Sequence, residues 1–359
     1  MMEKKSIMWH YIAEEPEVLN HLMQTEKIRE FAYKEGKKIE EIYFVAHGSS
    51  YNAAISVSDF MARAAGLKVY AYTPVNFQYN TPILQQGRTE KKMVIAISQT
   101  GTSSGVIEVL RCAHRQGFYT LGITDEPESP VAKEADATLL LECGREDSNA
   151  KTKGYSATLL LLLLLSVQFG RVRGTLTEET EKEIIAELKD QIAGILQITE
   201  KISRWCTDNV FGKELSELYV LGYGMNFGTA MEGQLKLMET MCIPTMFNDI
   251  GEFSHGMHRA ITEKSSILLM QTNHPLQKLT EETFCYLKGI TKHVLMLDAT
   301  GCFKEEPDRI LLPEYPFTQS ILLMTLAVQI LSVFAPEFQG EDPNRDAHND
   351  FTEFVHTRV

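Results

Sequence analysis

The chain of 359 residues lacks the features that define several protein classes. Its six cysteines are scattered without a Cys-x-x-Cys pair, and no secretory signal pattern is found, so we expect reduced thiols in a cytoplasmic protein. Clustered basic residues are missing and the net charge is −13, which disfavours nucleic acid or an anionic membrane as a partner. The leucine run 159–165 is far shorter than the roughly 20 apolar residues of a membrane span. We expect a buried core helix there.

Two nucleotide-binding signatures are also absent, since the sequence has neither the Gly-Lys-Ser/Thr of a P-loop nor a G-x-G-x-x-G motif. A different turn joins an apolar strand predicted over 92–97 to an amphipathic helix predicted over 106–113. Its sequence is Ser98-Gln99-Thr100-Gly101-Thr102-Ser103-Ser104-Gly105. Hydroxyl groups, amide groups and backbone N–H groups therefore gather at a helix N-terminus, where the helix dipole favours an anion.

A second turn of the same form lies upstream, at 47–54. A predicted strand, 43–46, runs into a glycine that is followed by Ser49 and Ser50 at the start of a helix. Turns that follow neighbouring parallel strands meet at the carboxyl edge of an open sheet, where doubly wound folds bind ligands. Ser and Thr are also common helix caps, which is the alternative interpretation. The presence of two such turns favours a phosphorylated small molecule.

Predicted strands and helices alternate up to about residue 170 and again from about residue 217, which is typical of parallel sheets covered on both faces. We therefore predict an α/β protein with two tandem, doubly wound parallel sheets. The predicted segments are an N-terminal helix at 1–27, a phosphate-binding domain at 28–175, a helical connector at 176–205, a second domain at 206–335 and a tail or lid at 336–359.

The second half of the chain repeats the first. Residues 43–48 align with 219–224, and 76–79 align with 252–255 at the same offset. After a short deletion, the strand that precedes Ser98 aligns with 267–270, but the residues that follow have lost the glycine and most hydroxyl groups. We therefore expect phosphate binding in the first half only, and a different contribution from the second.

A predicted helix over 229–242 carries Glu232, Lys236 and Glu239 at positions i, i+4 and i+7, on one face. A solvated stripe of ion pairs is the alternative interpretation. The equivalent helix of the first half is mostly apolar, which indicates that this face packs inward. A buried carboxyl group with a raised pKa is suited to moving protons between adjacent carbon atoms.

Two histidines outside this helix are further candidates. His255 lies beside a glycine in a polar turn, and imidazole is suited to protonating a sugar ring oxygen near neutral pH. His348 lies in the polar segment 340–349, which is either a frayed terminus or a lid.

The motifs together resemble those of tandem sugar isomerase (SIS) domain proteins, which have a flavodoxin-like fold. Along nearly its whole length the chain is similar to the isomerase half of glucosamine-6-phosphate synthase. The resemblance is carried by four segments that occur in the same order in that family, namely 48–52, 98–101, 230–239 and 251–256.

The resemblance implies the following roles. A sugar 6-phosphate is bound by Ser49, Ser50, Ser98, Gln99, Thr100 and Ser103. Glu239 moves a proton between C1 and C2, His255 assists ring opening, and Lys236 belongs to the same cleft. Glu232 and Lys151 contact the substrate. The family also implies a homodimer or higher oligomer in which His255 reaches a neighbour's site, with no metal or cofactor.

Two departures from the family bear on the reaction. We expect no glutaminase domain with an N-terminal nucleophilic cysteine, and His348 occupies the place of a lysine that engages the open-chain sugar in the family. We therefore expect a deglycase of an amino acid–sugar 6-phosphate of the fructosamine or glucosamine type, with Glu146 and Asp147 as candidate ligands for an ammonium group. The alternatives are an aldose–ketose phosphate isomerase, a glutaminase-lacking aminotransferase and a non-catalytic sugar-phosphate sensor.

Overall fold

The computed structural model describes residues 6–80, 89–209 and 211–358. The chain forms two compact units, each assembled from segments that are far apart in the sequence. The first-sheet unit comprises Glu17–Glu146, Lys153–Glu183 and Asp346–Val359, and the second-sheet unit comprises Met1–Pro16, Asp147–Thr152 and Ile184–Arg345. The division predicted from the sequence is continuous along the chain, whereas these units are interleaved.

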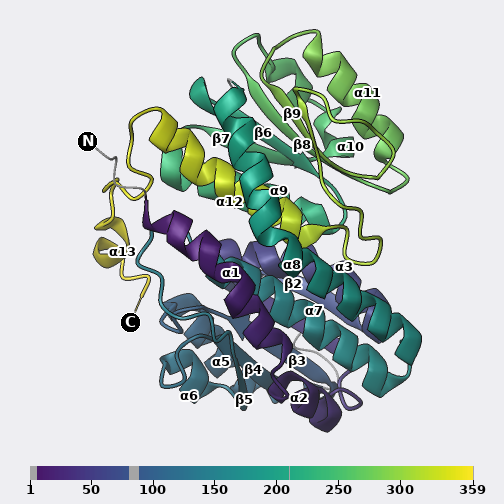
Figure 1. Ribbon diagram of the computed structural model, residues 1–359. Coiled ribbons are helices and arrows are strands. Elements are labelled where there is room, and N and C mark those ends of the chain that lie inside the picture. The colour runs from purple at the N-terminus through teal and green to yellow at the C-terminus, as the bar shows by residue number, and fades with distance from the viewer. Residues whose placement is uncertain (1–5, 81–88, 210, 359) are drawn as a thin grey trace. The chain divides into compact units, whose positions relative to one another are not determined.

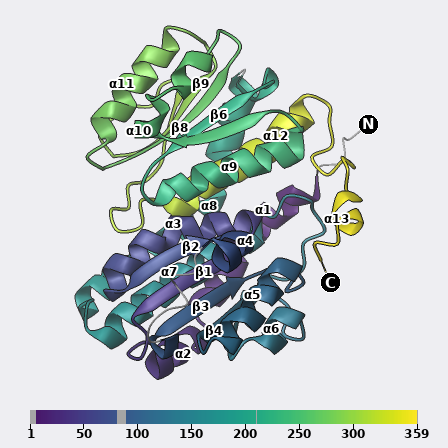
Figure 2. The same ribbon diagram turned by 180° about the vertical axis from the view of Figure 1, so that it is seen from behind.

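The first-sheet unit contains a five-stranded parallel sheet, as predicted. Its spatial order is β2 (Lys68–Tyr72), β1 (Glu41–Ala46), β3 (Lys92–Ile97), β4 (Tyr119–Thr124) and β5 (Ala137–Leu140). In β1 and β3 every residue after the first is buried, because helices cover both faces of the sheet (Figures 1 and 2). The two strands are adjacent, and Ala46 pairs with Ile97 at their carboxyl ends.

Helices form two groups around this sheet. Helices α2 (Lys27–Glu35), α3 (Gly48–Ala65) and α7 (Lys153–Arg173) pack together, and α4 (Pro74–Tyr79), α5 (Ser104–Arg115) and α6 (Pro130–Glu134) form the other group. Phe77 of α4 and Val109 of α5 share a hydrophobic cluster with Val45 and Val94 of the sheet. The unit also contains η2 (Thr89–Lys91) and the short α13 (Phe351–Phe354).

The second-sheet unit has a sheet of the same topology. Its order is β10 (Arg309–Leu311), β9 (Val294–Ala299), β8 (Ser266–Thr272), β6 (Leu218–Gly222) and β7 (Thr245–Asp249), with all strands parallel. Read from the other edge, the order is β7, β6, β8, β9 and β10. This matches the order β2, β1, β3, β4 and β5 of the first sheet. The structure therefore confirms the internal repeat predicted from the sequence.

Helices also cover the second sheet. Helices α9 (Met225–Met241) and α12 (Ile321–Phe338) pack against each other, with α9 against β6 and β7, while α10 (Ile250–Phe253) and α11 (Gln277–Lys288) share a separate cluster with the sheet. The unit also contains two short 3-10 helices, η3 (Phe211–Lys213) and η4 (Met257–Ala260).

Two long helices contribute residues to both units, namely α1 (Ile7–Met23) and α8 (Glu178–Asp208). The predicted connector, 176–205, overlaps α8. The start of α8 is capped, because the hydroxyl of Thr177 accepts a hydrogen bond from Thr180 N at 3.1 Å.

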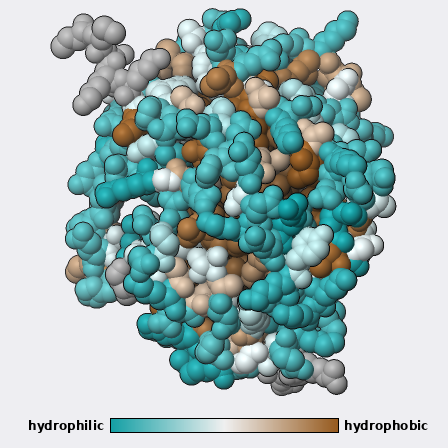
Figure 3. Space-filling model, turned by 60° about the horizontal axis from the view of Figure 1, so that its bottom comes forward, coloured by the Kyte–Doolittle hydropathy of each residue, from teal (hydrophilic) through white to brown (hydrophobic). Residues whose placement is uncertain are grey.

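Helices α7 and α12 are long and apolar enough to cross a membrane by length and composition. In each, however, 83% of the most apolar window is buried, which is typical of a core helix. The leucine run at 159–165 lies within α7 and is buried throughout, as predicted. Hydrophilic residues cover most of the face shown in Figure 3, and the hydrophobic residues exposed there form small separate groups.

Candidate active site

The first predicted phosphate turn joins β1 to α3. Gly48 has a φ of 54°, which glycine adopts without steric cost. Ser49 and Ser50 lie half-buried in the first turn of α3. The N-cap residue, His47, makes no side-chain capping hydrogen bond. The turn therefore brings two hydroxyl groups to a helix N-terminus, where an anion is favoured.

The second predicted phosphate turn joins β3 to α5. Gly101 has a φ of 65°, and a Cβ at this position would lie 2.1 Å from Ser129 Oγ, so only glycine fits. Ser98 is buried directly after the strand, and the hydroxyl of the more exposed Thr100 lies 3.0 Å from that of Thr102. Ser103 is the N-cap of α5, yet its side chain makes no capping hydrogen bond. Capping therefore does not explain the hydroxyl of Ser103.

The two turns lie at one edge of the first sheet, as the sequence predicts. They follow adjacent strands, and a Cβ built at Gly105 would lie 3.1 Å from His47 Nε2. Desolvation in the folded chain lowers the pKa of His47, which favours its neutral form. Sequence analysis did not single out His47, although its place just before the glycine of the turn was a usable signal.

Glu146 is a buried support for the second turn. Its Oε2 accepts hydrogen bonds from Gln99 Nε2 and Gly154 N, both at 3.0 Å, and its Oε1 accepts one from Lys153 N at 3.1 Å. The carboxylate thus lies at the start of α7 and fixes the Gln99 amide. We expected Glu146 to hold a substrate ammonium group. These donors engage both carboxylate oxygens, which favours a supporting role for Glu146 over the binding of an ammonium group.

The C-terminal segment of the first-sheet unit contacts the start of α5. The carbonyl oxygen of Thr357 accepts hydrogen bonds from Ser104 N at 3.2 Å and Ser104 Oγ at 3.0 Å, and Arg358 forms an isolated β-bridge with Ser103. These contacts favour the lid over the frayed terminus, because a frayed terminus makes no such hydrogen bonds. His348 lies in the same segment with an exposed side chain and a φ of 60°.

The predicted acid–base helix is α9, in the second-sheet unit. Glu232 and Lys236 are fully buried, and Lys236 Nζ lies 3.1 Å from Glu232 Oε1. The face therefore packs inward as predicted, and the alternative of a solvated stripe is excluded. A buried ion pair of this kind is stable only while both partners are present.

Glu239 lies half-buried in the last turn of α9. Burial raises the pKa of its carboxyl group to about 7, the positive charges of Lys236 and Lys151 lower that pKa, and the negative charge of Glu232 raises it. A carboxyl group with this pKa is present in both protonation states near pH 7. It is therefore suited to accept a proton and return it in successive steps.

The other predicted residues of the second-sheet unit differ in exposure. Lys151 is half-buried, and its ammonium group donates a hydrogen bond to Ser148 O at 3.1 Å. His255 is exposed in the turn after α10, where its backbone N–H donates to Glu252 O at 2.9 Å. An exposed imidazole is compatible with a role at another subunit's site, which stays a prediction.

The second copy replaces the phosphate turn with a buried charge network. At the end of β8, Gln271 Nε2 donates to Asp298 Oδ2 at 3.4 Å and to Glu281 Oε2 at 3.3 Å. Both carboxylates also form ion pairs with Arg309. Two carboxylates therefore lie where the first copy has its hydroxyl-rich turn, which supports the expectation that this copy does not bind phosphate.

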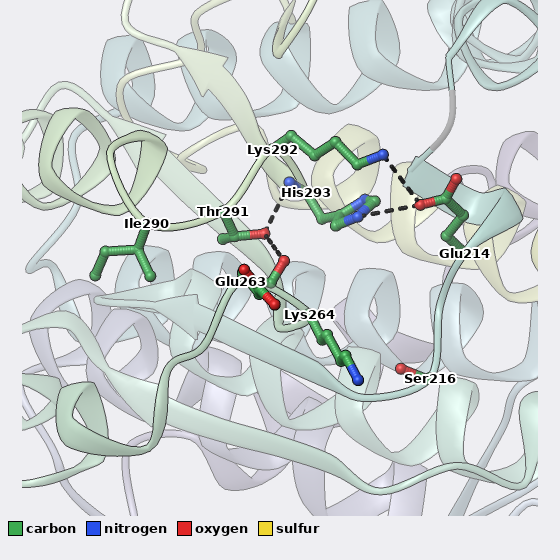
Figure 4. A pocket seen from close by; sticks show the side chains of 8 residues that line it. All are labelled: Glu214, Ser216, Glu263, Lys264, Ile290, Thr291, Lys292 and His293. Carbon is green, nitrogen blue, oxygen red and sulfur yellow. Dashed lines mark hydrogen bonds and ion pairs between the residues drawn. The ribbon is translucent and has the colours of Figure 1, made fainter.

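A hollow of about 610 Å³ lies at the amino ends of β6, β8 and β9 (Figure 4). Its lining residues are Glu214, Ser216, Glu263, Lys264, Ile290, Thr291, Lys292 and His293. The carboxylate of Glu214 pairs with His293 Nε2 at 3.2 Å and with Lys292 Nζ at 3.4 Å. None of the predicted site residues lines this hollow. In the described part of the chain, no three His, Cys, Asp or Glu side chains are grouped to hold a metal ion.

The raised pKa of Glu239 predicts how activity depends on pH. If its carboxylate removes the proton, kcat/KM rises with pH and levels off above an apparent pKa of about 7. The phosphate group of a substrate also titrates, near pH 6. A Glu239→Asp variant measured over the same pH range is the control, because only the inflection due to the carboxyl group moves. Identical profiles for the two proteins would contradict the assignment.

Comparison with known proteins identifies the family. Residues 37–168 match the SIS domain. Glutamine–fructose-6-phosphate aminotransferase (isomerizing) of Caldanaerobacter subterraneus subsp. tengcongensis is 31% identical over 315 residues, which cover 86% of this chain and 51% of that protein. The chain thus spans about half the length of this relative.

Solved structures share the fold. A candidate phosphosugar isomerase from Clostridium difficile 630 superposes with a TM-score of 0.88 at 23% identity, and the match covers 98% of each chain. The C-terminal domain of glucosamine-fructose-6-phosphate aminotransferase from Francisella tularensis gives a TM-score of 0.87 at 20% identity, over 96% of this chain and 99% of that one. The chain therefore contains a SIS domain and is homologous to the isomerase half of glutamine–fructose-6-phosphate aminotransferase.

Proposed function

We propose that this protein is a sugar-phosphate enzyme that releases an amine from an amino acid–sugar 6-phosphate conjugate. The observation that carries the proposal is the carboxyl group of Glu239, whose pKa is about 7. Such a group is suited to proton transfer between carbon atoms. The first-sheet unit has two helices that begin with hydroxyl-rich turns, which are suited to binding a phosphate group. The relative's name adds the substrate class, since that enzyme acts on fructose 6-phosphate.

The proposed reaction proceeds by moving one double bond. In a 1-amino-1-deoxyketose 6-phosphate, the Glu239 carboxylate takes a proton from C1 while the carbonyl oxygen on C2 gains a proton from solvent, which yields an enaminol with a double bond between C1 and C2. The same carboxyl group returns its proton to C2 while the nitrogen atom loses its proton to solvent, so that C1 becomes doubly bonded to nitrogen. Water adds to this imine, the C–N bond breaks, and an amine and a hexose 6-phosphate leave. For a 2-amino-2-deoxyaldose 6-phosphate, C1 and C2 exchange roles.

The remaining predicted residues assist these steps. Ser98, Thr100 and Ser103 hold the phosphate, so that binding energy far from the reacting carbons fixes the sugar for proton transfer. His255 acts as the acid and base that opens the sugar ring, in a homodimer or higher oligomer with shared sites. His348 contacts the open-chain sugar but forms no imine with it.

A panel of phosphorylated substrates tests the proposal. The purified protein is incubated with 6-phosphates of 1-amino-1-deoxyketoses and of 2-amino-2-deoxyaldoses, and free amine and hexose 6-phosphate are measured. Equal amounts of both products support a deglycase. Interconversion of fructose 6-phosphate and glucose 6-phosphate without amine release identifies an isomerase, and binding without any conversion identifies a sensor.

Removal of two hydroxyl groups from the second turn tests the phosphate assignment. Each hydrogen bond to a charged group contributes about 1.5–3 kcal/mol, so Ser98→Ala with Thr100→Ala is expected to raise KM at least 10-fold for each bond lost. The measurement is KM for the phosphorylated substrate that the panel identifies. Thr207→Ala, an exposed hydroxyl on α8, is the matched control and leaves KM unchanged. An unchanged KM in the double variant would remove these residues from the site.

A further inference from the structure

The segment Asp147–Thr152 belongs to the second-sheet unit, although the residues on either side of it belong to the other unit. Asn149 anchors it to Asn344 and Arg345, the last residues of the same unit. Its backbone N–H donates to Asn344 Oδ1 at 3.2 Å, and its side-chain amide donates to Arg345 O at 3.4 Å. Residues 148–151 are therefore held by contacts that are distant in sequence.

Arg345 connects this segment to the helix that carries Glu239. Its guanidinium group donates to Thr240 O at 3.0 Å and to Met241 O at 2.7 Å, which are among the last carbonyl groups of α9. A helix leaves these carbonyls without partners of its own, and a cation satisfies them. Arg345 thus holds the segment that bears Lys151 at the end of α9, beside Glu239.

Lys151 and Lys236 are the two cations that affect Glu239, and they differ in accessibility. Both lower the pKa of Glu239, so both lie close to it. Lys236 is fully buried in its ion pair with Glu232. Lys151 is only half-buried, and its ammonium group contacts a carbonyl oxygen, Ser148 O, at 3.1 Å. Of the two, Lys151 is therefore the more accessible residue.

We propose that Lys151 binds the carboxylate of the amino-acid part of the substrate, which makes the enzyme selective for sugars attached to an α-amino group. This inference rests on the proposed deglycase function. The carboxyl carbon of an α-linked amino acid is two bonds from the nitrogen atom on the reacting carbon. A cation beside Glu239 is within reach of that carboxylate. In a sugar attached to the side-chain amine of lysine, the carboxyl carbon is six bonds away from the nitrogen.

The charge of the whole protein is unfavourable for a substrate with two anionic groups, and a cation at the site offsets it. With a net charge of −13, the protein repels a substrate that carries both a phosphate and a carboxylate. The predicted phosphate turns supply only neutral hydroxyl, amide and N–H donors. An ammonium group at the reacting end offsets that repulsion for the second anion.

The test compares two substrates that differ in one group. They are the 6-phosphates of N-(1-deoxyfructosyl)glycine and N-(1-deoxyfructosyl)ethylamine, which carry a carboxylate or a methyl group at the same position. The wild-type protein is expected to prefer the glycine conjugate in kcat/KM by roughly 10- to 150-fold, the range for a hydrogen bond between charged groups. Lys151→Met reduces this ratio to about 3-fold or less, and Lys151→Arg retains most of it.

The ratio separates recognition from other effects of the substitution. Loss of the Lys151 charge also raises the pKa of Glu239, but this changes the rate for both substrates and cancels in the ratio. Lys264→Met, an exposed lysine in the same unit, is the matched control and keeps the wild-type ratio. A wild-type ratio near one, or a ratio that Lys151→Met leaves unchanged, overturns this proposal alone. If the wild-type protein releases amine from neither compound, the proposed deglycase function fails with it.

Discussion

Replacement of Glu239 by glutamine is expected to lower kcat for amine release by about 10²- to 10⁴-fold, the usual contribution of a general acid–base group. The amide has nearly the same shape as the carboxyl group but neither accepts nor returns a proton. Phosphate binding involves other residues, so the dissociation constant of a substrate analogue is expected to stay within a few-fold. A steady-state assay of amine release measures kcat, and an equilibrium binding experiment measures the dissociation constant.

The same variant is expected to stabilise the folded protein at alkaline pH. Because burial raises the pKa of Glu239 from 4.5 to about 7, ionisation of the folded protein above pH 7 costs free energy. Glutamine avoids that cost, so the free energy of unfolding at pH 8 rises by up to about 3 kcal/mol relative to wild type. Below pH 4.5 both states of the wild-type protein are protonated and the difference disappears. Near-normal turnover together with unchanged stability would remove Glu239 from its proposed role.

Lys236→Met is expected to destabilise the second-sheet unit by about 3–5 kcal/mol, because it leaves the Glu232 carboxylate buried without its partner. Glu232→Gln combined with Lys236→Met removes both charges and is expected to recover most of this loss. Trp9 and Trp205, the two tryptophans of the chain, both belong to the second-sheet unit. Their fluorescence during urea unfolding therefore follows this unit.

A surface pair with the same spacing is the control for this experiment. Glu178 and Lys182 also lie at i and i+4 and form an ion pair of 2.6 Å, but both side chains are exposed. Lys182→Met is expected to leave stability unchanged, since solvent screens exposed pairs. If Lys236→Met changes the free energy of unfolding as little as Lys182→Met does, then the buried ion pair does not stabilise α9.

The repeated sheets and the two hydroxyl-rich turns were predictable from the sequence, because local patterns determine them. Apolar residues without interruption indicated buried parallel strands, and Gly48 and Gly101 marked sharp turns before helices. The inward orientation of Glu232 and Lys236 required a comparison between the two copies. A charged stripe alone does not distinguish a solvated face from a buried one.

Contacts between distant segments could not be read from the sequence. The hydrogen bond between Glu146 and Gln99 spans 47 residues, and the contact of Ser104 with Thr357 spans 253 residues. Neither has a periodic signal, because each depends on how strands and helices pack. For the same reason the sequence does not reveal that Arg345 contacts both the end of α9 and Asn149, two residues before Lys151.

The interleaving of the two units limits how the gene for this protein can be divided. Cutting the chain between the halves of its repeat, within the α7–α8 region, leaves Met1–Pro16 and Asp147–Thr152 on the fragment that carries the first sheet. The other fragment then lacks two segments that complete its own core. Each half of the repeat is therefore not a self-sufficient module. A gene rearrangement that moves one half of the repeat alone separates the second sheet from these two segments. A rearrangement that moves both halves together keeps them.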